Sequence, residues 1–358
     1  MDPVSRAGKK PRVVVAMSGG VDSSVAAALL VEQGYDVVGI SLKLADRKVS
    51  GDDAIGGCCS IDDFADARRV ADALGFPHYT LNLTREFHEA VVKPFAEDYL
   101  AGRTPVPCAR CNEVVKFDML WTRAAALGAD FLATGHYARR IGDGLFTAVD
   151  RAKDQSYFLF SIPRANLEHV LFPIGDLTKS EVREIARSRG LSISEKPESQ
   201  ELCFVPTGDY AGWIERFAPE RAPGSGEIVD AGGNVLGTHP GSHRFTVGQR
   251  KGLGLARPNP LYVLQVDAEA NRVIVGEEAE LERDRLRATR VNWLCDARFD
   301  GKVSVKVRHR NEPGPARLVE VEPGVVDVLF DEPKRAIAPG QAAVFYAGEQ
   351  VLGGGWIA

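Results

Sequence analysis

The chain has 358 residues, of which 44% are hydrophobic and 26% are charged, an ordinary composition for a globular protein of two or three domains. Its 44 Lys and Arg against 49 Asp and Glu give a net charge of −5, so overall charge does not favour a nucleic-acid partner. No stretch approaches the roughly 18 apolar residues of a membrane helix, and the polar N-terminus lacks the apolar core of a secretory signal. We therefore expect a cytoplasmic protein with no membrane partner and few disulfides.

Residues 12–200 alternate strand-like and helix-like segments. The apolar run 12–17 predicts a buried strand, a glycine turn follows, and residues 22–33 predict an alanine-rich helix. Strands that alternate with helices in this way predict an α/β doubly wound parallel sheet. Further strands are predicted at 36–44, 78–83 and 130–134, and further helices at 60–74, 86–100, 113–127 and 178–189.

Beyond about residue 205, glycines and prolines separate short segments of alternating polarity, which is typical of β structure. The last part of the chain predicts strands at 302–308, 317–321, 325–330, 342–346 and 349–357, and a small closed β-barrel would accommodate them. We expect three domains: the α/β domain over residues 1–205, a small mainly-β central domain over 206–285, and the C-terminal β-barrel over 286–358.

The segment Ser18-Gly19-Gly20-Val21-Asp22-Ser23 lies directly between the first strand and the first helix. Glycines let the backbone approach an anion closely, and the free N–H groups and positive dipole end of a helix start then hold it. The serines add hydroxyl donors, and Asp22 can reach a Mg²⁺ ion or a ribose. A Walker A loop would carry a lysine after its last glycine, and this loop has none, so γ-phosphate transfer is not indicated.

This loop resembles the PP-loop of the ATP-pyrophosphatase families. The resemblance implies that ATP, with Mg²⁺, is cleaved between its α- and β-phosphates and that AMP is transferred to a carbonyl or carboxyl oxygen. The loop alone does not choose among these families, which include small-molecule synthetases as well as tRNA thiolases.

Three cysteines lie in polar loops. Cys108 and Cys111 belong to the proline-bounded segment 104–112, and Cys203 follows Lys196-Pro197 in a second loop. We expect Cys111 near a helix N-terminus beside Arg110, where a thiolate is favoured. The residues alone leave two alternatives open, a zinc or Fe–S ligand pair at Cys108 and Cys111 and a buried core thiol at Cys203.

Together these segments resemble the tRNA-specific 2-thiouridylase family, which thiolates the wobble uridine of certain tRNAs. The resemblance is carried by AMSGGVDSS (16–24), GCC (57–59), TGHY (134–137), KDQSYFL (153–159), SQELCF (199–204) and FTVGQRKGLG (245–254).

The resemblance implies that Cys203 carries a persulfide, that Cys111 is the second catalytic cysteine, and that the two form a disulfide when hydrosulfide is released. It implies tRNA as substrate and a persulfide-carrying protein as sulfur donor. It assigns the nucleotide to Ala16, Met17, Ser18, Gly19, Gly20, Val21, Asp22, Ser23, Leu42 and Gly135. It assigns the target base to Val106, Pro107 and Cys108, and other tRNA contacts to His136, Lys153, Asp154, Gln155 and Gln341. Arg308 and His309, in the basic segment 302–310, are further candidates for tRNA contact.

The chain departs from the family's usual Thr-Pro-Asn-Pro-Asp loop, because Val106 replaces the Asn and Cys108 replaces the Asp. Residue 108 therefore has no carboxylate that could take part in a step such as proton transfer. Cys108, Cys111 and Cys203 would suffice to hold a [4Fe–4S] cluster with one open iron, and we prefer the persulfide route to this alternative. Two further hypotheses are an adenylating synthetase or ligase acting on a small molecule, and an RNA-binding Fe–S scaffold without turnover.

Residues 302–310 predict a strand with two distinct faces. Positions 303, 305 and 307 are valine, whereas 302, 306, 308 and 310 are basic. Because a strand points alternate residues to opposite faces, the valines would pack the barrel and the basic row would face outward. Two interpretations of that row stay open, an ordinary solvated strand face and a surface for RNA phosphates.

Overall fold

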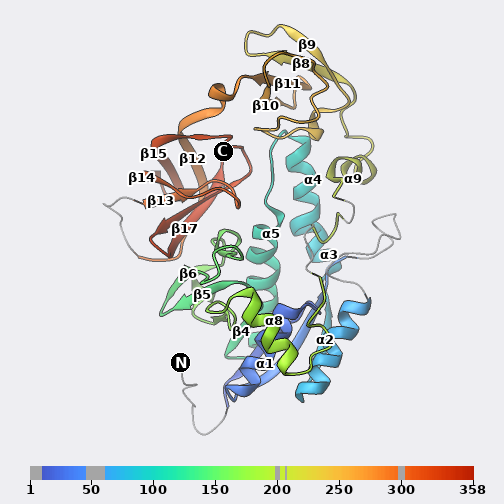
Figure 1. The fold of residues 1–358 in the computed structure, drawn as a ribbon, viewed down its shortest axis with the longest axis vertical. Helices are drawn as coiled ribbons and strands as arrows, with labels where there is room; N and C mark the ends of the chain where they lie inside the picture. The colour runs from blue at the N-terminus through green and yellow to red at the C-terminus, as the bar shows by residue number, and fades with distance from the viewer. Residues whose placement is uncertain (1–9, 46–60, 198–201, 206–207, 297–302) are drawn as a thin grey trace. The chain divides into compact units, whose positions relative to one another are not determined.

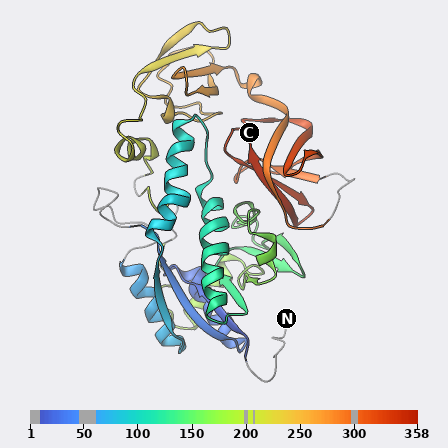
Figure 2. The ribbon, with the colours of Figure 1, turned by 180° about the vertical axis from the view of Figure 1, so that it is seen from behind.

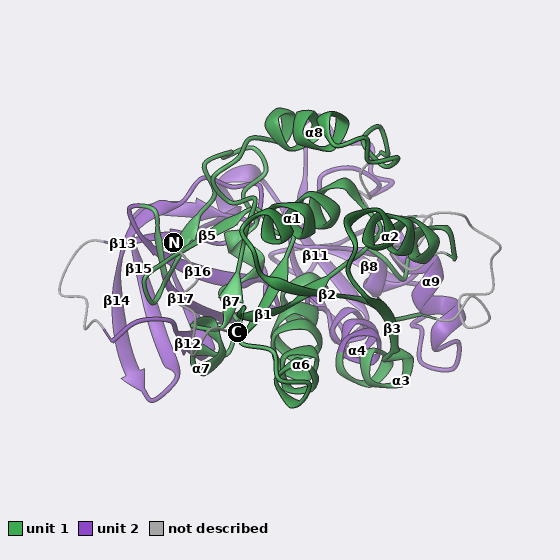
Figure 3. Cartoon of the chain, turned by 90° about the horizontal axis from the view of Figure 1, so that it is seen from below, with its two compact units in different colours: residues 1–90, 108–208, 349–351 green, residues 91–107, 209–348, 352–358 purple. Residues whose placement is uncertain are grey.

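The computed structural model describes residues 10–45, 61–197, 202–205, 208–296 and 303–358. The segments Gly57–Cys59 and Ser199–Glu201 and the predicted basic residue Lys302 lie outside the described residues. Within the described part, no helix has both the length and the apolar character needed to cross a bilayer. The chain divides into two compact units, which Figure 3 distinguishes by colour: unit 1 holds residues 1–90, 108–208 and 349–351, and unit 2 holds residues 91–107, 209–348 and 352–358.

Unit 1 is built on a five-stranded parallel sheet, which confirms the predicted fold class. The strand order is β3-β2-β1-β4-β7, and all four pairings are parallel. The central strand is an unbroken apolar run because both of its faces are covered. The strands are β1 (Arg12–Ala16), β2 (Asp36–Lys43), β3 (His78–Asn82), β4 (Phe131–Thr134) and β7 (Val170–Leu171).

Helices cover both faces of this sheet (Figures 1 and 3). One face carries α1 (Val21–Glu32), α2 (Ile61–Leu74) and α8 (Lys179–Ser188). The other carries the continuous helix α5–η2–α6 (Pro107–Arg110, Cys111–Leu120, Trp121–Ala126), which lies in front of β1 and β2 in Figure 2. The core between β1 and the first set of helices is apolar, and its fully buried residues include Val13, Val15, Val25, Ala67 and Val182.

Shorter elements complete unit 1. They are α3 (Thr84–Phe87), the hairpin β5 (Ala138–Ile141) and β6 (Gly144–Thr147), the single turn η3 (Ser156–Phe158) and α7 (Arg164–Leu167). Two residues of a late strand belong here as well, because Gln350 and Val351 pair with β6. The wider π-helical turn η1 (His88–Val92) spans the division between the units at residue 90.

The helix predicted at 113–127 starts earlier, at Pro107. A proline suits the first helical position, because its missing N–H would have had no partner there and its fixed φ already matches the helix. Cys108 lies in the first turn and Cys111 one turn later, so Cys111 lies further into the helix than the sequence predicted.

Unit 2 contains a four-stranded sheet with the order β10-β11-β8-β9. Its elements are α4 (Lys93–Leu100), α9 (Tyr210–Phe217), β8 (Gly226–Asp230), β9 (Val235–His239), η4 (Ser242–Arg244), β10 (Tyr262–Asp267), β11 (Arg272–Gly276) and η5 (Glu278–Leu281). The buried residues of this sheet form a small core of their own that includes Ile228, Phe245 and Val263.

The C-terminal strands of unit 2 close into the expected β-barrel. The order β12-β15-β14-β13-β16-β17 is closed by pairing of β12 with β17. Closure removes the exposed sheet edges that would otherwise pair with other chains. The strands are β12 (Glu282–Trp293), β13 (Val303–Lys306), β14 (Gly314–Glu322), β15 (Val325–Arg335), β16 (Ala342–Ala347) and β17 (Gln350–Ile357). Val303, Val305 and Val307 are buried in the barrel core, as their alternation predicted.

Candidate nucleotide and thiol site

The phosphate loop of unit 1 connects the end of β1 to the start of α1. Gly19 has a φ of +73°, a left-handed conformation that glycine adopts without strain. Gly20 is the N-cap of α1, so the first N–H groups of the helix point out of its end without a side-chain cap. The hydroxyl of Ser23 donates to the Gly20 carbonyl (3.1 Å) and accepts from the Ser18 N–H (3.2 Å), which fixes the turn.

Gly135 lies against this loop from the neighbouring strand. The register places Ala16 opposite both Ile40 of β2 and Thr134 of β4, so the carboxyl ends of three strands meet at one edge of the sheet. A Cβ on Gly135 would lie 2.5 Å from the Ser23 nitrogen. The structure therefore brings Gly135 to the predicted loop residues 16–23, whereas Leu42 lies two residues beyond Ile40 on β2.

This edge of the sheet fits a nucleotide. Ligands of open parallel sheets bind outside the carboxyl ends of the strands, and an uncapped helix start there holds a phosphate. The close approach of Gly135 and the left-handed turn at Gly19 both require that a side chain be absent. Together these features suit a phosphate-bearing ligand such as a nucleotide at this edge of the sheet.

Asp22 in the phosphate loop is held by two residues that the sequence analysis did not assign. The ammonium of Lys179 donates to both Asp22 carboxylate oxygens at 2.7 and 2.9 Å, and the Tyr137 hydroxyl donates to Oδ1 at 2.9 Å. Lys179 is the first residue of α8, where Thr178 and Glu181 form a reciprocal capping box. The helix at 178–189 was predicted from the sequence, but an ion pair between residues 157 positions apart along the chain was not.

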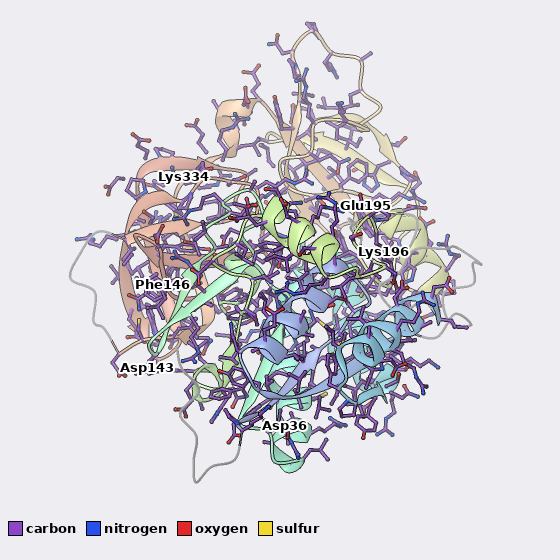
Figure 4. All side chains as sticks on the ribbon, turned by 60° about the horizontal axis from the view of Figure 1, so that its bottom comes forward. Asp36, Asp143, Phe146, Glu195, Lys196 and Lys334 are labelled. Atoms are coloured by element: carbon purple, nitrogen blue, oxygen red, sulfur yellow. The ribbon has the colours of Figure 1, made fainter. Side chains whose placement is uncertain are left out.

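Lys196 also contacts the phosphate loop. Its ammonium donates to the Gly19 carbonyl (3.1 Å), to Asp63 Oδ1 (2.6 Å) and to Asp66 Oδ2 (2.5 Å). Figure 4 shows Lys196 and its neighbour Glu195 in the segment that follows α8. In the sequence, Lys196 carries no signal beyond its place before Pro197.

The predicted thiols have different environments. Cys108 is exposed in the first turn of α5, Cys111 is buried, and Cys203 is partly buried. Phe204, next to Cys203, packs edge-to-face on Phe87 of α3 with ring centroids 5.8 Å apart. This aromatic contact anchors the backbone beside Cys203 in unit 1.

Arg110, the neighbour of Cys111, makes two contacts of its own. Its guanidinium donates to the Ala90 carbonyl (3.3 Å) and pairs with Glu113 (3.0 Å). Across the described residues, no three His, Cys, Asp or Glu side chains gather as ligands for a metal ion, so the [4Fe–4S] alternative at Cys108, Cys111 and Cys203 gains no support.

Three of the residues assigned to tRNA in unit 1 make internal contacts. Asp154 is buried and accepts hydrogen bonds from the Ala148 N–H (2.9 Å) and the Ser156 hydroxyl (2.7 Å). Gln155 Oε1 accepts from the Tyr137 N–H (3.0 Å). His136 shares a hydrogen bond with the Thr134 hydroxyl (2.8 Å), and burial holds its pKa well below the usual range. Lys153, in the same turn, is partly exposed.

The tRNA residues predicted in unit 2 lie at two places. Gln341 donates its amide N–H to the Thr104 carbonyl (2.9 Å), and so ties the start of the loop predicted to contact the base to the barrel. Val106 is buried at the end of that loop, and Pro107 begins α5. The basic row is shorter than predicted, because β13 ends at Lys306 and the later basic residues follow it in a turn. Arg308 there donates to the Val247 carbonyl (2.6 Å), and His309 is exposed.

The parallel sheet and its uncapped glycine loop define a nucleotide-binding protein of the PP-loop, or HUP-domain, class. Family models agree along the chain: the tRNA methyl transferase HUP domain matches residues 11–207, the tRNA methyl transferase PRC-barrel domain matches 213–277, and the aminomethyltransferase beta-barrel domain matches 283–357.

Curated relatives extend over nearly the whole chain. The tRNA-specific 2-thiouridylase MnmA of Geobacter metallireducens is 50% identical over 359 residues, covering 97% of each chain. That of Acidobacterium capsulatum is 49% identical over 367 residues, covering 96% of this chain and 98% of the relative. This chain belongs to the tRNA-specific 2-thiouridylase family. A solved 4-thiouridine synthetase–RNA complex with bound ATP is 20% identical over 59% of this chain and 51% of that chain, and its TM-score of 0.39 adds nothing to the assignment.

Proposed function

We propose that the chain is an ATP-dependent sulfurtransferase of the cytoplasm that replaces the C2 oxygen of the wobble uridine of tRNA with sulfur. The observation that carries the proposal is the uncapped glycine loop at the carboxyl edge of the sheet, in a chain that belongs to the 2-thiouridylase family and has cysteines at 111 and 203. The loop lacks a Walker lysine, which favours retention of pyrophosphate over transfer of the γ-phosphate.

Adenylation is the first step of the proposed reaction. The uracil C2 oxygen attacks the α-phosphorus of ATP, the α–β bond breaks, and pyrophosphate leaves. The phosphate loop holds the pyrophosphate through backbone N–H groups, and a Mg²⁺ ion, when bound, would neutralise part of its charge. The step converts a poor leaving oxygen into AMP, so that a sulfur nucleophile can displace it from C2.

Sulfur transfer is the second step. A persulfide-carrying donor protein passes sulfane sulfur to Cys203, which then carries S–SH. In one branch this terminal sulfur attacks C2 and AMP leaves, and Cys111 then cleaves the S–S bond between the uracil sulfur and Cys203. In the other branch Cys111 attacks Cys203 first, and the released hydrosulfide displaces AMP. Both branches end in a Cys111–Cys203 disulfide, which an external thiol must reduce before the next turnover.

The target base must leave its stack to reach these groups, at a cost of a few kcal/mol. We propose that residues 106–108 receive it and that Lys153, His136, Arg308, His309 and Gln341 serve tRNA binding directly or by holding the loops that contact it. Exposed His309 and partly exposed Lys153 suit phosphate contacts, whereas the Gln341 amide contacts the Thr104 carbonyl.

A single-turnover experiment tests the sulfur route. The enzyme is loaded with ³⁵S-labelled persulfide, freed of donor, and mixed with ATP and tRNA without reductant. We expect one sulfur per enzyme to reach 2-thiouridine in wild type and none in Cys203→Ala, whereas Cys295→Ala is the matched control and should transfer normally. Transfer by Cys203→Ala at the wild-type rate would contradict the proposal.

A further inference from the structure

Lys196 contacts both the backbone of the phosphate loop and two carboxylates at the start of α2. It donates to the carbonyl of Gly19 at 3.1 Å, and it pairs with Asp63 and Asp66 at the start of α2. The side chain of Lys196 is 28% exposed, and those of Asp63 and Asp66 are 15% and 13% exposed, so this charge cluster is only weakly screened by water.

The contact with Gly19 determines where the next N–H group points. In a trans peptide, the carbonyl of one residue and the N–H of the next point in opposite directions. Because Lys196 holds the Gly19 carbonyl on the α2 side of the loop, the Gly20 N–H is directed away from α2. Gly20 is the N-cap of α1, and N–H groups at such a position can bind an anion.

The loop cannot relax away from α2 without losing this arrangement. A Cβ on Gly19 would lie 2.2 Å from the Asp63 carbonyl oxygen, so the two backbones are already in close contact. Without the Lys196 contact, the left-handed Gly19 has the freedom to rotate its carbonyl toward the phosphate site, where a carbonyl oxygen would repel an anion.

The charge of Lys196 should also favour binding of a polyphosphate at this loop. Asp63 and Asp66 are two carboxylates beside a loop built for a polyphosphate, and Arg69, which also pairs with Asp66, is 63% exposed. Lys196, Arg69, Asp63 and Asp66 together are neutral; without Lys196 they carry one net negative charge. Burial by itself would lower the pKa of Lys196, but its bonds to Asp63 and Asp66 raise the pKa above its usual value, so the ammonium stays charged.

We propose that Lys196 is a positioning residue for the polyphosphate of ATP, which it serves without touching it, by fixing the Gly19–Gly20 peptide and by cancelling the charge of Asp63 and Asp66. This inference rests only on the nucleotide half of the proposed function. The backbone at Lys196 must also be held in place for this role. The Lys196 N–H donates to the Ile193 carbonyl (3.0 Å), and Ile193 is buried in the core under α8.

The test is calorimetric binding of inorganic pyrophosphate with Mg²⁺, of ATP with Mg²⁺, and of adenosine. We expect Lys196→Met to weaken pyrophosphate and ATP binding by about ten- to a hundredfold, the range for loss of a charged hydrogen-bond partner, and to leave adenosine binding unchanged. Lys196→Arg should retain most of the affinity. The matched control is Glu195→Gln, which removes a more exposed ion pair with Arg187 one residue away and should bind all three like wild type.

A charge-restoring variant separates the two parts of the proposal. Lys196→Met with Asp63→Asn returns the cluster to neutrality but leaves the Gly19 carbonyl unheld, so it should recover part of the lost pyrophosphate affinity. If it stays as weak as Lys196→Met, the charge part is wrong. If Lys196→Met itself binds pyrophosphate like wild type, or if Glu195→Gln loses as much, the whole inference is wrong.

Two other outcomes, an unfolded Lys196→Met variant and a wild type that binds no pyrophosphate or ATP, also have a defined meaning. If Lys196→Met does not fold, as judged by circular dichroism and lost adenosine binding, Asp63→Asn alone replaces it: the proposal predicts pyrophosphate affinity at or above wild type, and a weaker affinity overturns it. If wild type fails to bind pyrophosphate or ATP at all, the nucleotide half of the proposed function fails, and the inference about Lys196 fails with it.

Discussion

Replacing Gly135 with alanine should damage the nucleotide site through a single added carbon. The new Cβ would lie 2.5 Å from the Ser23 nitrogen, 2.7 Å from the Asp22 carbonyl carbon and 2.9 Å from the Ser23 Cα. These are backbone atoms in the first turn of α1, so they cannot swing aside as a side-chain tip can. The helix start must move by about 0.5–1 Å to reach ordinary contact distance, and overpacking of this kind costs about 1–3 kcal/mol.

Two assays measure the effect of Gly135→Ala. A destabilisation of about 1–3 kcal/mol in a unit of this size corresponds to a fall of roughly 2–12 °C in the melting temperature of unit 1, which scanning calorimetry measures. ATP affinity should fall at least about tenfold, because the N–H groups of α1 move with the helix start. The control is Gly224→Ala, since a Cβ there meets nothing within 4 Å, and it should melt and bind like wild type. A Gly135→Ala protein with unchanged melting and ATP affinity would refute the close approach of β4 to α1.

Three further changes have defined outcomes. Lys179→Met leaves the Asp22 carboxylate, 29% exposed, without its cation, and should lower the urea stability by about 1–2 kcal/mol. Burial lowers the pKa of His136, whereas the same side chain in the unfolded protein takes up a proton at about pH 6.5. The free energy of unfolding should therefore fall as the pH drops below about 6.5. The urea midpoint of His136→Gln should fall less between about pH 8 and about pH 5 than that of wild type. Gln341→Ala frees the Thr104 carbonyl and should lower kcat/KM for tRNA by about tenfold with ATP binding unchanged, and an unaltered kcat/KM would mean that this contact does not serve the base loop.

The fold could be predicted from the sequence where a single segment carries its own signal. The apolar run of β1, the glycine loop and the alanine-rich α1 are contiguous, and hydrophobic period and turn residues identify each of them. Strand alternation likewise identified the buried valines of β13. The start of the Cys108 helix was missed because the prolines before it indicated a loop, although a proline also suits the first helical position.

The support of the site could not be predicted, because it depends on contacts between distant segments. Lys179 and Lys196 reach the phosphate loop from positions 157 and 177 residues away in the chain, and a lone lysine in a sequence is most often a solvated surface residue. Asp154 shows the converse: its carboxylate is used inside the fold, although the sequence placed it in a segment assigned to tRNA.

The central claim is that ATP adenylates the uracil C2 oxygen, and the fate of that oxygen tests it most directly. A substrate tRNA that carries ¹⁸O at C2 of the wobble uridine would be incubated with enzyme, ATP and a persulfide donor, and the nucleotide products analysed by mass spectrometry. The account predicts one ¹⁸O in AMP for each 2-thiouridine formed and none in pyrophosphate. Formation of 2-thiouridine with the ¹⁸O in water or inorganic phosphate, and unlabelled AMP, would contradict it.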